Sequence, residues 1–186
     1  MNNIPNSPKP EIVLALSRKS IIIENVIPKE LCEELISFGN DNVRVGENKY
    51  ANYFQISFHS CLLSLNHKVH DVLQDAWKTV ANQLNVNIDF IEPYELKRYT
   101  KDDFFGRHTD NYSSLTIDVD RKLTMSIQLS NDDEYENGEL VVLGQKYKLR
   151  QGSIICFPSY FPHLVEPITK GTRWSLIGWA WGPSWR

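Results

Sequence analysis

The residues best suited to chemistry lie in the segment YTKDDFFGRHTD, residues 99–110. An imidazole at His108 and a carboxylate at Asp110 are two residues apart, so they would lie on the same side of an extended strand. The two side chains could therefore hold one metal ion from two corners. His163, in the segment PSYFPHLVEP, is the candidate for a third ligand.

Two histidines and one carboxylate are the ligand set of the facial triad in non-haem Fe(II) oxygenases, which keeps further coordination positions open. His-x-Asp alone is a weak signal, because strand and turn residues often have this spacing by chance. Arg173 adds a second element, since it follows His163 by ten residues and opens the apolar segment Trp174–Trp181. A guanidinium is costly to bury there without an anion, and its planar fork suits a carboxylate.

The composition is that of a soluble globular protein. The chain has 186 residues, of which 41% are hydrophobic and 23% charged, and its net charge is −3. This balance gives no broad basic surface for nucleic acid, and no stretch approaches the ~20 apolar residues of a membrane span. No secretory signal is evident, and three scattered cysteines argue against a disulfide framework or a Cys-rich zinc site. We therefore expect a cytoplasmic protein without nucleic-acid or membrane partners.

Helices are expected to come first and strands afterwards. Residues 1–19 are rich in Asn, Pro and Lys, which predicts a poorly structured arm. Ser20–Val26 predicts a strand, and Pro28 should open a helix that Gly39 ends. Asn66–Leu84 has apolar residues at a spacing of three and four, which is typical of an amphipathic helix.

From Tyr94 onward, short apolar runs alternate with Gly and Pro turns. This pattern predicts many short strands: Tyr94–Tyr99, Leu123–Leu129, Leu140–Leu143, Ser153–Phe157, His163–Ile168 and Trp174–Trp181. We therefore expect a mainly β fold, a barrel or jelly roll braced by N-terminal helices. One domain would span residues 20–186, with helical support over about 27–90 and the β core over about 91–182.

Three smaller features leave alternatives open. The polar segment Asn40–Tyr53 predicts a long loop, which could act as a substrate lid. The strand Leu123–Leu129 has one polar face, which could line a cavity, although exposure to water is the expectation without other evidence. His67 and His70 could bind a metal at their helical spacing, but solvated or capping histidines are the stronger expectation.

The order His-x-Asp, distal His and Arg resembles that of the iron- and 2-oxoglutarate-dependent dioxygenases, in particular the prolyl 4-hydroxylase-like branch and its bacterial PKHD-type relatives. The resemblance covers about residues 94 to 181, roughly half of the chain. It rests on the segments YTKDDFFGRHTDN, LTMSIQLS, NGELVVL and LRQGSIICFPSYFPHLVEPITKGTRWSLIGW. The fold that it implies is a double-stranded β-helix.

The resemblance implies that His108, Asp110 and His163 bind Fe(II), and that Arg173 and Tyr99 hold the distal carboxylate of 2-oxoglutarate. Cofactor-pocket positions implied in the same way are Gln128, Ser126 and Trp179. The implied reaction consumes O2 and 2-oxoglutarate, releases succinate and CO2, and hydroxylates a substrate C–H bond, with ascorbate as a candidate reductant. The carboxylate of Asp110 favours hydroxylation, because related halogenases lack it.

Two departures from the family pattern limit the comparison. Gln55-Ile56-Ser57 stands where collagen-type prolyl hydroxylases often carry Arg-x-Ser, and Arg173 stands where many family members use Lys. Separately, Trp179 stands where nucleic-acid demethylases usually carry a further arginine, which argues against DNA or RNA repair. The favoured substrate is a protein or peptide, with proline as the favoured residue. A free amino acid or other small molecule is the alternative substrate. A non-enzymatic sensor of metal or 2-oxoglutarate is a third hypothesis, from a different functional class.

Overall fold

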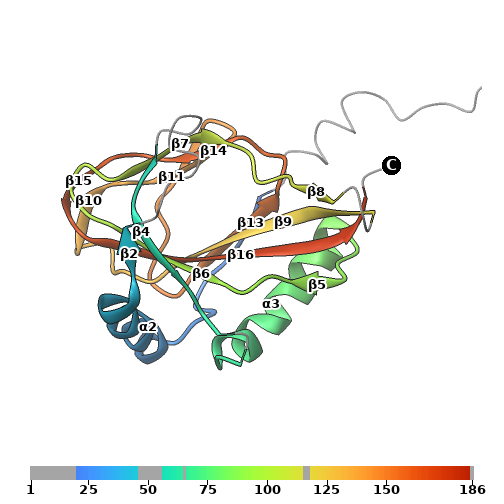
Figure 1. Cartoon of the computed structure of the whole chain (residues 1–186), viewed down its shortest axis with the longest axis horizontal. Helices are drawn as coiled ribbons and strands as arrows, with labels where there is room; N and C mark the ends of the chain where they lie inside the picture. The colour runs from blue at the N-terminus through green and yellow to red at the C-terminus, as the bar shows by residue number, and fades with distance from the viewer. Residues whose placement is uncertain (1–19, 46–55, 65, 115–117, 185–186) are drawn as a thin grey trace, which may run out of the picture.

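The computed structural model describes residues 20–45, 56–64, 66–114 and 118–184 (Figure 1). The predicted arm, residues 1–19, lies outside the described residues, as do residues 46–53 of the predicted loop. Two helices are described, α2 (Lys29–Asn42) and α3 (Val69–Leu84). Neither helix is long and apolar enough to cross a membrane.

The described strands are antiparallel and form two large sheets and a short ribbon. The order in the nine-stranded sheet is β1 (Ile21–Ile23), β13 (Ile154–Pro158), β9 (Val119–Gln128), β16 (Arg173–Pro183), β6 (Glu95–Tyr99), β4 (His59–Leu62) and β2 (Arg44–Val45), with β5 (Phe90–Ile91) beside β16 and β8 (Ser113–Ser114) beside β9. The order in the five-stranded sheet is β12 (Gln145–Tyr147), β11 (Leu140–Val142), β14 (His163–Val165), β7 (Phe104–His108) and β3 (Ile56–Ser57). The ribbon pairs β10 (Tyr135–Asn137) with β15 (Ile168–Gly171).

Both helices cover the outer face of the nine-stranded sheet, while the five-stranded sheet lies across its inner face (Figure 1). The main apolar core fills the space between helices and sheet, because the apolar spacing of α3 turns Leu73, Trp77 and Val80 toward the strands. The indole Nε1 of Trp77 donates a 2.7 Å hydrogen bond to the buried hydroxyl of Tyr94. The predicted β fold with two bracing helices is confirmed, whereas its exact domain boundaries stay predictions.

The predicted end of the first helix at Gly39 is wrong, because α2 continues to Asn42. Gly39 is buried inside the helix, where a Cβ atom would lie 2.4 Å from Cζ3 of Trp174 and 2.8 Å from Cδ2 of Leu96. Glycine is needed here because it lets the helix approach the sheet closely. The usual association of glycine with the C-terminal end of a helix therefore does not hold at this position. The predicted loop therefore begins later than Asn40, and β2 follows from Arg44.

The predicted strand His163–Ile168 is two strands in the structure, β14 and β15. Pro167 separates them, because proline has no N–H to give to a sheet ladder. His67 was expected to be solvated or capping, and its Nδ1 accepts a 3.2 Å hydrogen bond from the N–H of Val69 at the start of α3.

The polar face of β9 does not face water, contrary to the expectation from the strand pattern alone, and it is turned inward, as the family resemblance implied for Ser126 and Gln128. Thr124, Ser126 and Gln128 are all buried. The five-stranded sheet covers this face (Figure 1). Its strands come from segments far from β9 in the sequence, so the strand pattern of β9 alone does not show this cover. β9 therefore presents apolar side chains to the helices and polar side chains to the interior between the sheets.

Replacing Gly39 by valine should destabilise the fold, because the added side chain has no room against Trp174. We expect the free energy of unfolding to fall by about 1–3 kcal/mol, the usual effect of overpacking a core. Chemical denaturation measures the change. Ser37→Val, at an exposed position of the same helix, should change stability by no more than about 0.5 kcal/mol. Equal stability of the two variants would contradict the close contact.

Candidate functional site

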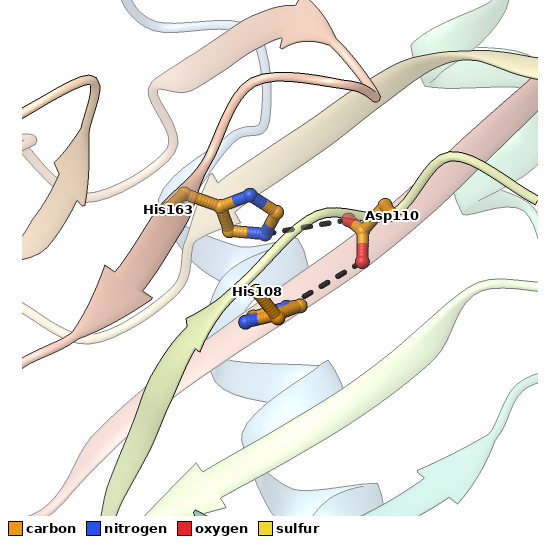
Figure 2. A group of neighbouring side chains, drawn as sticks. All are labelled: His108, Asp110 and His163. Carbon is orange, nitrogen blue, oxygen red and sulfur yellow. Dashed lines mark ion pairs between the residues drawn. The ribbon is translucent and has the colours of Figure 1, made fainter. Parts of the chain in front are cut away.

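Three predicted ligands converge in the five-stranded sheet, where the inner strand β7 ends and the inner strand β14 begins. His108 and His163 are direct partners on the neighbouring strands β7 and β14. Asp110 follows the end of β7, and its N–H donates a 2.8 Å hydrogen bond to the carbonyl of Ser159, just ahead of His163. Figure 2 shows the carboxylate of Asp110 facing both imidazole rings. One ligand atom from each residue lies within 4.8 Å of the others.

Backbone carbonyls fix the orientation of both imidazoles through their Nδ1 atoms. Nδ1 of His108 lies 2.8 Å from the carbonyl oxygen of Gly106, and Nδ1 of His163 lies 2.9 Å from that of Phe161. A carbonyl only accepts, so each Nδ1 carries the proton and donates. This is how protein metal sites usually orient a ligating histidine, and it directs Nε2 to the ion.

The Nε2 atoms of both rings face carboxylate oxygens. Nε2 of His108 is 3.5 Å from Oδ1 of Asp110, and Nε2 of His163 is 3.4 Å from Oδ2. With both Nδ1–H groups already donating, Nε2 of each ring is the atom that can carry a second proton or bind a metal ion. Either one, placed between an imidazole nitrogen and the carboxylate, satisfies both groups.

The Asp110 carboxylate is also held by two donors from the nine-stranded sheet. Oγ1 of Thr124 and Nε1 of Trp179 each donate a 2.9 Å hydrogen bond to Oδ2. Burial acts to raise the pKa of Asp110, but the contacts with His108 and His163 outweigh it and hold the pKa well below its usual range. The carboxylate therefore stays ionised and attracts positive charge.

The triad lines a pocket between the two sheets. Arg173 lines the same pocket and is only 3% exposed. Its Nε donates a 3.2 Å hydrogen bond to Oε1 of Gln128, and it forms no salt bridge with any described residue. Among the described residues its partners are this amide and the Tyr99 ring, whose centre lies 5.7 Å from Cζ, and both are neutral, so the guanidinium is suited to receive an anion.

The other predicted pocket residues have distinct places. Tyr99 is the cross-strand partner of Arg173 and lines the pocket, and burial raises the pKa of its phenol, which keeps the hydroxyl protonated. Ser126 also lines the pocket. Gln128 supports Arg173 and is itself held by donating to the carbonyl of Ser130. Trp179 both lines the pocket and bonds to the triad.

Three polar pocket residues were not assigned to the site from the sequence: Thr124, Ser175 and Lys97. The hydroxyl of Ser175 is buried in the pocket and has no hydrogen-bond partner among the described residues. Lys97 is only 4% exposed and also lines the pocket. The signal for both was alternation along a strand, because Ser175 lies two residues after Arg173 and Lys97 two residues before Tyr99.

Residues 94–181 match the family model of the 2OG-Fe(II) oxygenase superfamily. These residues belong to that superfamily. The matched segment contains the whole converging site, and the resemblance inferred from the sequence motifs is confirmed.

Similar curated proteins are PKHD-type hydroxylases. The oxygenase segment is 36% identical over 89 residues to one from Idiomarina loihiensis, covering 46% of this chain and 40% of that protein. It is 39% identical over 93 residues to one from Shewanella oneidensis, covering 47% of this chain and 42% of that protein. The matches therefore span less than half the length of these relatives.

The fold is similar to that of solved prolyl hydroxylases. The viral collagen prolyl hydroxylase of Paramecium bursaria Chlorella virus-1 aligns with a TM-score of 0.69 and 17% identity, covering 88% of this chain and 96% of that one. A prolyl-4-hydroxylase of Pseudomonas putida gives the same TM-score and identity, covering 91% and 96%. The predicted double-stranded β-helix is confirmed.

If the triad holds a metal ion, substitutions in the triad and in its hydrogen-bond donors should weaken metal binding. We expect no measurable Fe(II) or Mn(II) binding by His108→Ala or Asp110→Ala in anaerobic titration calorimetry. Trp179→Phe keeps an aromatic side chain but removes the N–H that donates to Asp110, so the affinity of this variant for the metal should fall about 10–100-fold.

Trp181→Phe is the matched control, because the indole of Trp181 donates to Glu92 and not to the triad. Its metal affinity should equal that of the unmodified protein. Unchanged metal binding by Asp110→Ala would contradict the assignment of this carboxylate as a ligand.

Proposed function

We propose that the chain is an Fe(II)- and 2-oxoglutarate-dependent dioxygenase of the prolyl 4-hydroxylase type, which hydroxylates a substrate C–H bond with release of succinate and CO2. One observation supports this most strongly. Two imidazoles and a carboxylate whose ligand atoms could hold one metal ion share their pocket with a buried guanidinium that forms no salt bridge with any described residue. The first suits a metal ion, and the second suits a dicarboxylate.

Nε2 of His108, Nε2 of His163 and the carboxylate of Asp110 would hold Fe(II), with the imidazoles positioned by the two backbone carbonyls. Thr124 and Trp179 keep the carboxylate in place from the opposite sheet. Bound iron would supply the activation of O2 that couples oxidation of the cosubstrate to hydroxylation.

Arg173 would bind the distal carboxylate of 2-oxoglutarate through its planar fork, with Gln128 holding the Nε side. The Tyr99 hydroxyl is a second donor to that carboxylate, because it remains protonated in the pocket. The unpartnered hydroxyl of Ser175 lies on the same face of β16 and would gain an acceptor in the same way. The apolar walls formed by Phe157, Leu140 and other pocket residues exclude water from the reaction.

A protein or peptide is the proposed substrate, with proline as the favoured residue. The support is the likeness to solved prolyl hydroxylases, one of which, from Trichoplax adhaerens (14% identity, TM-score 0.64), is bound to a peptide fragment of hypoxia inducible factor. A free amino acid or other small molecule is the alternative. A cytoplasmic location and the absence of nucleic-acid or membrane partners stay predictions from the composition.

The reaction is tested with purified protein, Fe(II), ascorbate, O2 and 2-oxoglutarate. We expect succinate to form slowly without a prime substrate, since uncoupled oxidation of the cosubstrate needs only the metal and the Arg173 side of the pocket. Mass spectrometry measures the succinate. No succinate from protein that binds iron would contradict the enzyme and leave the sensor as the better hypothesis.

Arg173→Ala should raise the concentration of 2-oxoglutarate required for half-maximal turnover by roughly 10–100-fold, because charge-assisted hydrogen bonds in a buried site are lost. Iron binding should remain. Arg150→Ala is the matched control, since the side chain of Arg150 is 78% exposed outside the pocket. An unchanged requirement in Arg173→Ala would exclude this residue from binding the cosubstrate.

A further inference from the structure

A buried lysine lies in the proposed active-site pocket and has no role in binding iron or 2-oxoglutarate as described above. Lys97 stands on the inward face of β6, two residues from Tyr99, and is the cross-strand partner of Ser175. It is 4% exposed and lines the same pocket as the metal triad. Lysine is rarely buried to this extent unless it is paired, because its ammonium loses hydration.

Aromatic rings surround the ammonium of Lys97. Its Nζ lies 4.4 Å from the ring centre of Phe58, 4.8 Å from that of Phe105 and 5.8 Å from that of Trp179. Each distance is within the range of a cation–π contact, which favours the charged form of the amine. The one anion paired with Lys97 among the described residues is Glu95, at 3.1 Å.

Two walls of this aromatic cage are also neighbours of the triad. The ring of Phe105 stacks on the imidazole of His108 with centres 3.8 Å apart and planes at 11°. The indole of Trp179 donates to Asp110. A molecule that presents a carbon to the metal therefore enters a space bounded by the same rings that hold Lys97.

The ammonium has donors left for a ligand. It carries three N–H groups, and Glu95 accepts from one side. The Glu95 side chain is 20% exposed, whereas Lys97 lines the pocket itself. Burial acts to lower the pKa of Lys97, but the charge of Glu95 and other nearby groups outweighs it and raises the pKa, so the amine is charged at neutral pH. An ammonium only donates, and a carboxylate is the acceptor that it binds most strongly.

We propose that Lys97 determines substrate specificity by binding a carboxylate of the molecule to be hydroxylated, at a place separate from the Arg173 clamp. This inference rests on the proposed function, since it names the substrate class of the same pocket. The carboxylate belongs either to a free amino acid or to an acidic residue or C-terminus of a peptide. The chemistry at Lys97 is the same for both sources.

The experiment compares paired probes that differ only in charge. Short proline-containing peptides carry Glu or Asp beside the proline in one form and Gln or Asn in the other, and free amino acids are paired with their amides. Gain of one oxygen atom is followed by mass spectrometry with the iron-loaded protein, 2-oxoglutarate and O2. We expect the acid form of a pair to be hydroxylated with a kcat/KM about tenfold or more above that of its amide. The pair that reacts identifies the source of the carboxylate.

Lys97→Met should bring the ratio of acid to amide close to one, and Lys97→Arg should restore part of the preference. Because Lys97→Met leaves Glu95 without its partner, the double variant Lys97→Met/Glu95→Gln is measured as well, and a cooperative thermal transition shows that each variant folds. Lys78→Met, at an exposed lysine of α3, should keep the full preference.

Equal rates for acid and amide probes in the unmodified protein would overturn the role of Lys97. So would a preference that survives in both Lys97→Met variants, or the absence of any hydroxylated probe while succinate is still released. The last result leaves the proposed dioxygenase standing. Absence of succinate from the unmodified protein, in contrast, would overturn the proposed function together with this inference.

Discussion

The site depends on an electrostatic constraint: two imidazole nitrogens and one carboxylate point at one another, and positive charge between them stabilises the group. Backbone carbonyls take the Nδ1–H groups of His108 and His163, so Nε2 of both rings is directed at Asp110. The pairing of β7 with β14 brings the two rings side by side. Thr124 and Trp179 reach across from the other sheet to keep the carboxylate from turning away. Residues from both sheets therefore hold one arrangement.

The nine-stranded sheet separates two environments. One face of its central strands packs on α2 and α3 through an apolar core. The other face carries polar and charged side chains that are equally buried, but between the sheets. Most of these polar groups have partners within the protein, as buried polar groups generally do. Within the part of the chain that the structure describes, Ser175 has no partner and Arg173 has only neutral ones, and these are the positions at which a ligand would complete the bonding.

Much of the fold and of the triad could be predicted from sequence, because they follow from local periodicity and from a spaced set of rare residue types. The helix α3 follows from its apolar spacing, and the triad from the order of His108, Asp110 and His163. Features that depend on contacts between distant strands could not be predicted. The strand pattern of β9 alone does not show that a second sheet covers its polar face, and the aromatic surroundings of Lys97 follow from strand register and ring packing.

The close contact between α2 and the nine-stranded sheet at Gly39 affects the pocket on the other face of the sheet. Trp174 packs against Gly39 on the outer face, while its neighbour Arg173 points into the pocket. Side chains alternate along a strand, so a slip of β16 by one residue would turn the guanidinium outward and the indole inward. The contact between Trp174 and Gly39 thus helps to fix the register of β16. Mutations beneath α2 would then alter the pocket without touching any residue that lines it.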